Sequence, residues 1–521
     1  MPKIPLLKKV KYLLSDWRAM RDGLPGNEYE LGRYQELFGR LKNQYVNFAS
    51  GLHYDAANQG RLQEDWTVSS DTPTQNFKPY WRPIIARSIK SVDNNPHTKA
   101  LLNALTSNVV GTGLRPQPRV KYTDGTTIDG INKILSEGWK RYNDEWDSTQ
   151  RNTHLEAQKI RFGEIFTTGS LLTNKVAAPK GNYLSIQSLM VNILRLDDSR
   201  DYLSTSFSDP QIKNTLFGIN LNSNGVPVSY WVKGFDNPLP SDNIWHSYKQ
   251  TSAEMYIGVP WIVTALKYLW ANENLIGDKL ISSRIQSMIG MFVPNSLANR
   301  LLGSNLNANN QIEMAPGKII YGEKGDEPSI LQADDSIKDV LEPLQRLLLH
   351  AISMTLGISY QTVTRDLVKT NMASGRINTN EDRKTYQHLQ RWFAKEVCQK
   401  DWNIFVKQMF AEGRVPGKGI VDYLKDPWKY NQVQWQGPGF DFIDPSKEAT
   451  AAIDLITAKM STLDRWYAEK YGSDWRDELT QISEEKKLMK TLGIDEDDVI
   501  KSMAKRGAPV NNGDDEDDNS E

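Results

Sequence analysis

The sequence has one cysteine, six histidines and no excess of either charge, and each shortage excludes a class of protein. Cys398 cannot form a disulfide within the chain and has no cysteine partner for a structural zinc, so we expect a small buried residue on a helix. No two histidines are spaced four residues apart, which argues against a helical zinc site. Lysine and arginine total 63 against 64 acidic residues, so any contact with DNA must be local.

The sequence also lacks long apolar runs and catalytic motifs. No stretch of eighteen apolar residues occurs, so no membrane-spanning helix is predicted. No phosphate-binding loop is present, and the nearest string, Gly413 to Gly419, is one residue short. No serine lies in a nucleophile elbow, and the acidic pairs Asp197-Asp198 and Asp334-Asp335 are typical of caps and turns. We therefore expect a protein that is not an enzyme and needs no cofactor or metal.

What the chain does contain is enough apolar sequence for a large fold. Its 521 residues, 39% of them apolar, predict two to four folding units. Residues 1–50 begin with a basic amphipathic segment, for which packing against a neighbouring subunit or service as an assembly arm is favoured. A membrane surface, nucleic acid or a scaffold protein are the alternatives for this arm. At the other end, the acidic residues 513–518 are expected to stay disordered.

The first half of the chain predicts helices followed by strands. Residues 83–110 have helical periodicity, interrupted at Asn94-Asn95-Pro96 and ended by the glycines of Val110-Gly111-Thr112-Gly113. Further on, residues 216–221 and 226–232 predict the two strands of an antiparallel hairpin around an Asn-Gly turn. The chain is thus expected to be α+β and mainly helical.

Two long helices flanking a small module are predicted in the middle of the chain. Residues 260–291 keep helical spacing over about 45 Å, and a second helix begins near Ser336 and contains Pro343. The module between them, 292–333, includes a strand at Ile319-Ile320-Tyr321. Together they suggest a stalk with a tip.

A polar loop and further helices are predicted after the stalk. Residues 359–378 read as the loop, after which Thr379 is expected to cap a long helix. Asp444 and Pro445 open another helix, and helical segments continue to about Lys505.

Several short signatures, in order along the chain, resemble the portal protein family of lambda-like tailed bacteriophages. Each is weak by itself, but their order covers about residues 50–500. They are Tyr54-Asp55-Ala56-Ala57 with Arg61 and Trp66, Ala86-Arg87, Asn94-Asn95-Pro96, Val109-Val110-Gly111-Thr112-Gly113, Gly163-Glu164, Asn224-Gly225-Val226-Pro227-Val228-Ser229-Tyr230-Trp231, Gly258-Val259-Pro260-Trp261, Asp444-Pro445-Ser446-Lys447-Glu448-Ala449 and Gly472-Ser473-Asp474-Trp475.

The resemblance implies a ring, usually of twelve subunits, around a DNA channel at one capsid vertex. Its regions would be an N-terminal arm (1–50), wing (51–259), first stem helix (260–291), clip (292–333), second stem helix (334–358), tunnel loop (359–378), long helix and wing return (379–443), helical crown (444–505) and acidic tail (506–521). The family implies packaging and ejection of double-stranded DNA through this head-tail connector.

The resemblance also implies partners and a location. The clip would dock the terminase large subunit and later head-completion, adaptor or tail proteins, and the ring would contact major capsid and scaffold proteins. The protein would belong to the virion and, during assembly, to the host cytoplasm, with no membrane partner. The rival classes are a packaging ATPase-nuclease, disfavoured by the missing phosphate loop, and another ring such as a head-tail adaptor or tail-sheath component.

The predicted tunnel loop supplies the candidate DNA-facing residues, which are Lys369, Asn371, Ser374 and Arg376. We expect Lys369 and Arg376 to touch DNA phosphates. An equally weighted alternative pairs them with Asp366, Glu381 or Asp382. The string Ala373-Ser374-Gly375-Arg376 departs from the Ser-Ser-x-Arg of family relatives.

Overall fold

The computed structural model describes residues 72–122, 128–203, 214–294, 318–322, 336–366, 368, 371–440, 445–471 and 475–493. The chain divides into two units, Met1–Asp71 and Thr72–Glu521, and every described residue belongs to the second. The predicted basic arm (1–50) and acidic tail (506–521) therefore lie outside the described residues, as do Asp334 and Asp335.

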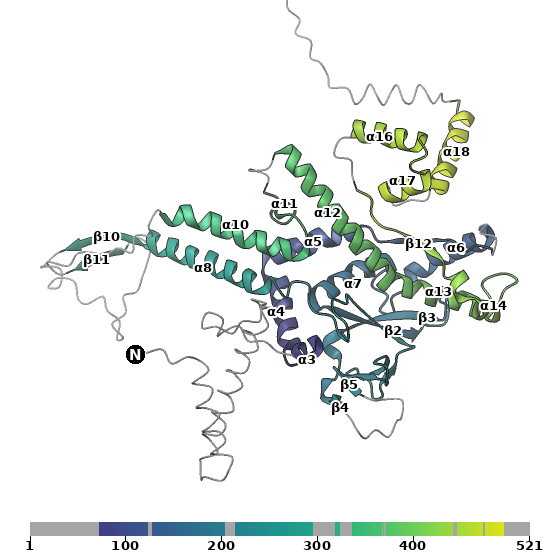
Figure 1. Cartoon of the computed structure of the whole chain (residues 1–521), viewed down its shortest axis with the longest axis horizontal. Coiled ribbons are helices and arrows are strands. Elements are labelled where there is room, and N and C mark those ends of the chain that lie inside the picture. The colour runs from purple at the N-terminus through teal and green to yellow at the C-terminus, as the bar shows by residue number, and fades with distance from the viewer. Residues whose placement is uncertain are drawn as a thin grey trace, which may run out of the picture. The chain divides into compact units, whose positions relative to one another are not determined.

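Helices make up most of the described chain (Figure 1). The α-helices are α3 (Pro73–Phe77), α4 (Trp81–Asn94), α5 (Pro96–Val109), α6 (Asp129–Glu145), α7 (His154–Thr168), α8 (Leu266–Met288), α10 (Ser336–Leu356), α11 (Tyr360–Thr364), α12 (Met372–Phe393), α13 (Gln399–Ala411), α14 (Ile420–Lys425), α15 (Pro427–Tyr430), α16 (Pro445–Thr457), α17 (Leu463–Lys470) and α18 (Trp475–Thr491). Three short 3-10 helices, η3 (Lys78–Tyr80), η4 (Ile193–Arg195) and η5 (Asp198–Arg200), and the π-helix η6 (Ala394–Cys398) complete the set.

The strands form small sheets. A three-stranded antiparallel sheet has the order β3-β2-β9, and a five-stranded one has the order β4-β5-β6-β7-β8. Two further pairs are β1-β12, which is antiparallel, and β10-β11, which is parallel. The strands are β1 (Arg115–Pro118), β2 (Ser170–Ala177), β3 (Ile186–Asn192), β4 (Tyr202–Leu203), β5 (Asn214–Leu216), β6 (Ile219–Leu221), β7 (Pro227–Tyr230), β8 (Leu239–Pro240), β9 (Ile244–Tyr248), β10 (Ile289–Pro294), β11 (Lys318–Gly322) and β12 (Val433–Gln436).

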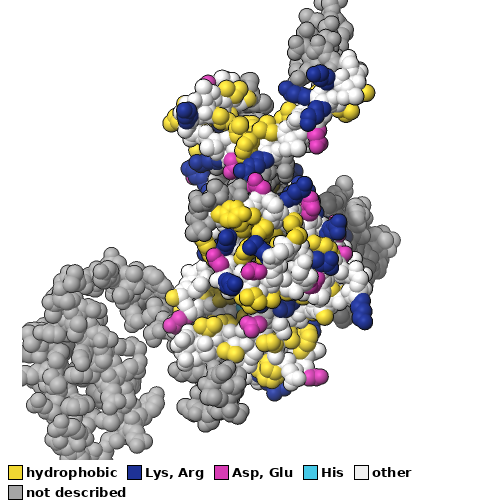
Figure 2. All heavy atoms as spheres, turned by 90° about the vertical axis from the view of Figure 1, so that its right-hand side faces the viewer, with side chains coloured by type: hydrophobic (Ala, Val, Ile, Leu, Met, Phe, Trp, Pro, Cys, Tyr) yellow, Lys and Arg dark blue, Asp and Glu magenta, His cyan; other side chains and the backbone are white. Residues whose placement is uncertain are grey.

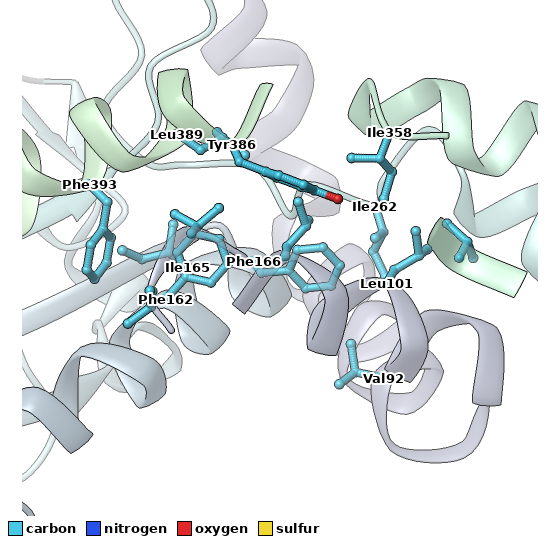
Figure 3. Close-up of a cluster of buried hydrophobic side chains, with 14 of the residues drawn as sticks. Val92, Leu101, Phe162, Ile165, Phe166, Ile262, Ile358, Tyr386, Leu389 and Phe393 are labelled. Carbon is cyan, nitrogen blue, oxygen red and sulfur yellow. The ribbon is translucent and has the colours of Figure 1, made fainter. Parts of the chain in front are cut away.

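The largest apolar cluster joins helices that are far apart in the sequence. Phe162, Ile165 and Phe166 of α7 face Leu389 and Phe393 of α12 across it (Figure 3). Residues from α5, α8, α10 and α11 belong to the same cluster. Because each large buried apolar side chain contributes about 1.5–3 kcal/mol relative to exposure, this cluster holds those helices together.

A buried ion pair ties α7 to α13 beside a second apolar cluster. Arg161 and His154 of α7 both contact the carboxylate of Asp401, the histidine through Nε2 at 3.0 Å, and all three side chains are inaccessible to solvent. Burial alone would raise the pKa of Asp401, but the Arg161 guanidinium and His154 outweigh burial and hold it below its ordinary value. The carboxylate is therefore charged, and the pair fixes α13 against α7.

Several sequence predictions are confirmed. Asn95 caps α5 by accepting hydrogen bonds from the N–H groups of His97 and Thr98, and Gly111 and Gly113 take positive φ after the helix. Cys398 is buried in η6, and Asp197 caps η5. Strand β11 contains Ile319-Ile320-Tyr321, and α10 starts at Ser336 with Pro343 inside it.

Two predicted elements differ from the structure. The predicted helix 260–291 is shorter, because α8 spans only Leu266–Met288 and the chain turns into β10 at Ile289. The predicted strand 216–221 is broken in two, since Phe217 and Gly218 both adopt positive φ and form the turn between β5 and β6.

Candidate functional site

Helices α8 and α10 lie side by side as a two-helix arm (Figure 1). Leu269 of α8, together with Leu349 and Ile352 of α10, is buried in the largest apolar cluster, so both helices are rooted in the same core. On faces of the two helices that do not enter this core, the arm exposes large apolar side chains. They are Tyr268, Trp270, Leu280 and Ile281 of α8 and Leu344, Leu347 and Met354 of α10.

A glycine contact sets the path of the chain into this arm. The N–H of Gly258 donates to the Ser170 hydroxyl at 2.7 Å, and a Cβ on Gly258 would lie only 2.0 Å from the carbonyl oxygen of Gly169. Gly169 itself has a φ of 86° and ends α7. The segment that leads to α8 is thus held directly against the start of β2.

The arm ends in the parallel pair β10-β11. Residues 289–294 pair with residues 318–322, with an irregularity in register near Ile289. The described strands of the predicted module 292–333 therefore lie at the end of the two helices. The rest of the module lies outside the described residues.

The predicted polar loop 359–378 is largely helical, which corrects the prediction. Ser359 caps α11, and α12 already begins at Met372, so Thr379 lies inside a helix and donates its hydroxyl hydrogen to the Gly375 carbonyl instead of capping. The actual cap of α12 is Asn371, whose side-chain oxygen accepts from the Ser374 N–H at 2.8 Å. Seven residues, 365–371, lie between the two helices, and Leu367, Lys369 and Thr370 among them are outside the described residues.

A buried carboxylate fixes this segment to α12. Asp382, 4% exposed, accepts hydrogen bonds from the Ser359 N–H at 2.8 Å, the Ser359 hydroxyl at 2.7 Å and the Thr362 hydroxyl at 2.6 Å. Burial and the neighbouring Asp382 carboxylate raise the pKa of Tyr386 to about 12. The start of α11 is therefore fastened to α12 one turn before Tyr386.

The four predicted DNA-facing residues have different surroundings. Asn371 and Ser374 lie together and are exposed, but they hydrogen-bond each other as the cap of α12. Arg376 is exposed on the first turns of α12, and Lys369 lies outside the described residues. The proposed alternative partners already have others, since Asp366 accepts from the Tyr360 hydroxyl and Glu381 pairs with Lys384.

Sequence reasoning missed a stacked group beside this segment. The ring of Tyr360 stacks on His350 with centroids 4.4 Å apart, and the Arg346 guanidinium lies 5.4 Å from the centre of the Tyr360 ring. Only the helical spacing of Arg346 and His350 could have signalled it. The group connects α10 to α11, and hence the arm to the segment that precedes α12.

Metal and membrane sites were searched among the described residues. There, no three His, Cys, Asp or Glu side chains gather where they could hold a metal ion. No helix within the described ranges has the length and apolar content needed to cross a membrane.

Comparison with known proteins identifies the family. A family model described as phage portal protein, lambda family, matches residues 59–390. The probable portal protein of Halomonas phage phiHAP-1 is 20% identical over 472 residues, covering 85% of this chain and 87% of that protein. Portal protein B of Escherichia phage lambda is 18% identical over 498 residues, and the portal protein of Escherichia phage N15 is 22% identical over 501 residues, each match covering 85% of this chain and 91% of the relative.

Solved structures give a weaker likeness. A chain from the virion of a native gene transfer agent particle is 11% identical, with a TM-score of 0.36, and the match covers 78% of this chain and 96% of that one. A chain from the neck of the same kind of particle, computed with C12 symmetry, is 12% identical with a TM-score of 0.34. The family model, by contrast, spans well over half of the sequence. The chain therefore belongs to the lambda family of phage portal proteins.

Proposed function

We propose that this chain forms a ring at one capsid vertex, as the head-tail connector through which double-stranded DNA is packaged and later ejected. The α8/α10 arm acts as the stem, β10-β11 belongs to the clip, and the helices from α16 onward form the crown. The clip docks the terminase large subunit first and head-completion or tail proteins later. The ring contacts the major capsid and scaffold proteins, and assembly takes place in the host cytoplasm.

The exposed apolar face of the arm is the observation that carries this proposal. Trp270 is 65% exposed and Leu347 is likewise 65% exposed, and further exposed apolar side chains lie on the same two helices. An extended apolar face of this kind marks a protein-protein contact. Identical arms from neighbouring subunits would cover it around a closed ring.

Electron microscopy of the purified full-length chain tests the proposal directly. We expect a stalked ring with a central hole. A Trp270→Glu variant should lose the ring, because an aromatic anchor buried at an interface is worth about 2 kcal/mol or more and a carboxylate cannot be buried there unpaired.

The matched control is Trp428→Glu, which changes a tryptophan of α15 that is 77% exposed and lies outside the arm. This variant should still form rings of unchanged mass. Monomers or tubes from the native chain would contradict the connector function, and intact rings from Trp270→Glu would remove the arm from the interface.

For DNA guidance, we propose that Lys369 and Arg376 face the channel and touch phosphates transiently. Arg376 is exposed on a helix whose start is fixed by the Asn371 cap and by Asp382, which supports a defined position for its charge. A few weak contacts suit a channel, since each tightly held phosphate would raise the barrier to sliding. The chain as a whole is nearly neutral, consistent with that requirement.

A further inference from the structure

A groove of about 430 Å³ lies between α12, η6 and the strand β12. Its lining includes two cations, Arg391 and Lys395, and no aspartate or glutamate. Both side chains are exposed, and neither has an ion-pair partner among the described residues. Five glutamines line the groove beside them, namely Gln387, Gln390, Gln399, Gln434 and Gln436.

One of these glutamines has an unpaired carboxamide at the groove. Gln436 is 6% exposed as a residue, and its carboxamide makes no hydrogen bond within the described chain. Its amide atoms are not among the described polar atoms that are both buried and unpaired, so they remain accessible to a ligand in the groove. In contrast, the amide N–H groups of Gln390 are used, since its Nε2 donates to the Asn108 carbonyl at 2.9 Å and to the Pro438 carbonyl at 3.2 Å.

The backbone of β12 adds further donors on this side. Strand β12 pairs only with β1 in the described sheets, and the Arg119 N–H donates to the Gln432 carbonyl at 2.9 Å. Hydrogen-bonded positions alternate along an antiparallel pair, and Pro116, opposite Trp435, has no N–H to donate. The N–H of Trp435, a groove residue, therefore points away from β1 and is available.

We propose that this groove binds the chain's own acidic C-terminal run, Gly513-Asp514-Asp515-Glu516-Asp517-Asp518. The run presents five carboxylates and no cation, and the groove offers two cations, free amides and an unpaired strand edge. Hydrogen bonds to ionised carboxylates are about twice as strong as neutral ones. An extended peptide beside β12 can use all three kinds of donor.

A long connection joins the acidic run to the described chain. The described chain ends at Gly493, and the intervening residues could span about 65 Å if fully extended. A tethered segment has an effective concentration of about millimolar order, so even a weak groove would hold it. The groove has the size of a small-ligand site, which admits a few extended residues but not a DNA duplex.

A fluorophore on the tail of the full-length protein tests the proposal. Cys398 is buried, so a Ser520→Cys variant can be labelled at that position beside the acidic run without changing any of its carboxylates. We expect high anisotropy of the label at low salt. Adding Arg391→Glu and Lys395→Glu should lower the anisotropy to its value at high salt, and Gln436→Leu should lower it in part.

The matched control reverses two exposed lysines elsewhere, with Lys407→Glu and Lys425→Glu, and should leave the anisotropy high. An equal drop of the anisotropy in the control would mean that general charge attraction, rather than this groove, holds the tail. If the anisotropy of the groove variant stays high, the proposal is wrong. Release of the label by a short DNA duplex would identify a nucleic-acid site instead. If the variant with both Arg391→Glu and Lys395→Glu unfolds, the anisotropy of the Gln436→Leu variant tests the proposal. None of these measurements requires ring formation.

Discussion

Two buried histidines have lowered pKa values in the fold. Burial lowers the pKa of His154, although its hydrogen bond to Asp401 opposes the shift. Burial and the nearby Lys400 ammonium lower the pKa of His246 to about 3, and its Nε2 has no hydrogen-bond partner among the described residues. The ring of His246 instead packs 4.6 Å from Tyr248, measured between centroids, so it behaves as an apolar side chain.

These two shifts make the fold sensitive to acid. The unfolded chain takes up a proton at each histidine as pH falls below 6.5, and the folded chain does so only at lower pH, so the free energy of unfolding decreases as pH falls. For His246, whose pKa lies far below this range, the loss between pH 7 and pH 5 is about 2 kcal/mol. Urea unfolding at both pH values should therefore show a smaller loss, by about that amount, in His246→Phe.

A substitution at an exposed histidine of α12 serves as the comparison. His388→Phe should keep the full pH dependence of the native chain, because that side chain is not buried. An unchanged pH dependence in His246→Phe would show that the residue is already protonated in the folded chain.

Among the helices and strands, boundaries set by neighbouring residues could be predicted from the sequence, and those set by contacts between distant segments could not. The break at Asn94-Asn95-Pro96 was predicted because the cap and the proline act within one turn. The start of α12 was misplaced because Thr379 and Asp382 have the spacing of a capping box. In the structure the Asp382 carboxylate of α12 accepts hydrogen bonds from the hydroxyls of Ser359 and Thr362 at α11. A pattern within one helix cannot predict such a contact between helices.

The functional segment was predictable only in part, for the same reason. The chain order of two helices and an inserted module could be read from periodicity, and α8, α10 and β11 were found close to their predicted places. The helices within residues 359–378 could not be predicted from periodicity, because α11 spans only five residues and depends on hydrogen bonds to the Asp382 carboxylate. The stacking of Tyr360 on His350 likewise depends on tertiary packing.

Two glycines near the arm give opposite expectations. Gly258→Ala should destabilise the chain by about 1–3 kcal/mol, because its Cβ would collide with the Gly169 backbone, which cannot move without displacing β2. Gly277→Ala on α8 should instead stabilise it by about 0.5–1 kcal/mol, since no atom lies within 4 Å of the added Cβ. Denaturant midpoints of the two variants check both signs, and equal midpoints would contradict the close approach at Gly258.

At the scale of the whole molecule, one core serves both the arm and the proposed DNA-facing segment. Ile262 and Leu269 at the root of α8 share a cluster with Ile358, Tyr360 and the residues of α12. Close-packed cores deform little, so displacement of one group is felt by the others. Displacement of the proposed channel-facing residues is thus expected to displace the root of the arm as well.

The proposed contact with DNA has a direct test in the phage. Replacing Lys369→Ala and Arg376→Ala together should lower the number of packaged genomes several-fold, because the channel loses its few local cations. Counting genomes per particle by quantitative PCR measures the effect. Lys99→Ala with Lys407→Ala, both exposed elsewhere, should package normally, and normal packaging by the first pair would rule out its proposed role.

The parallel pairing at the end of the arm restricts how that end can evolve. A parallel pair cannot be closed by a tight turn, and two such strands need a crossover connection of about a dozen residues or more. Insertions into such a connection leave the pairing intact. Shortening it to a hairpin would require one of the two strands to reverse its direction.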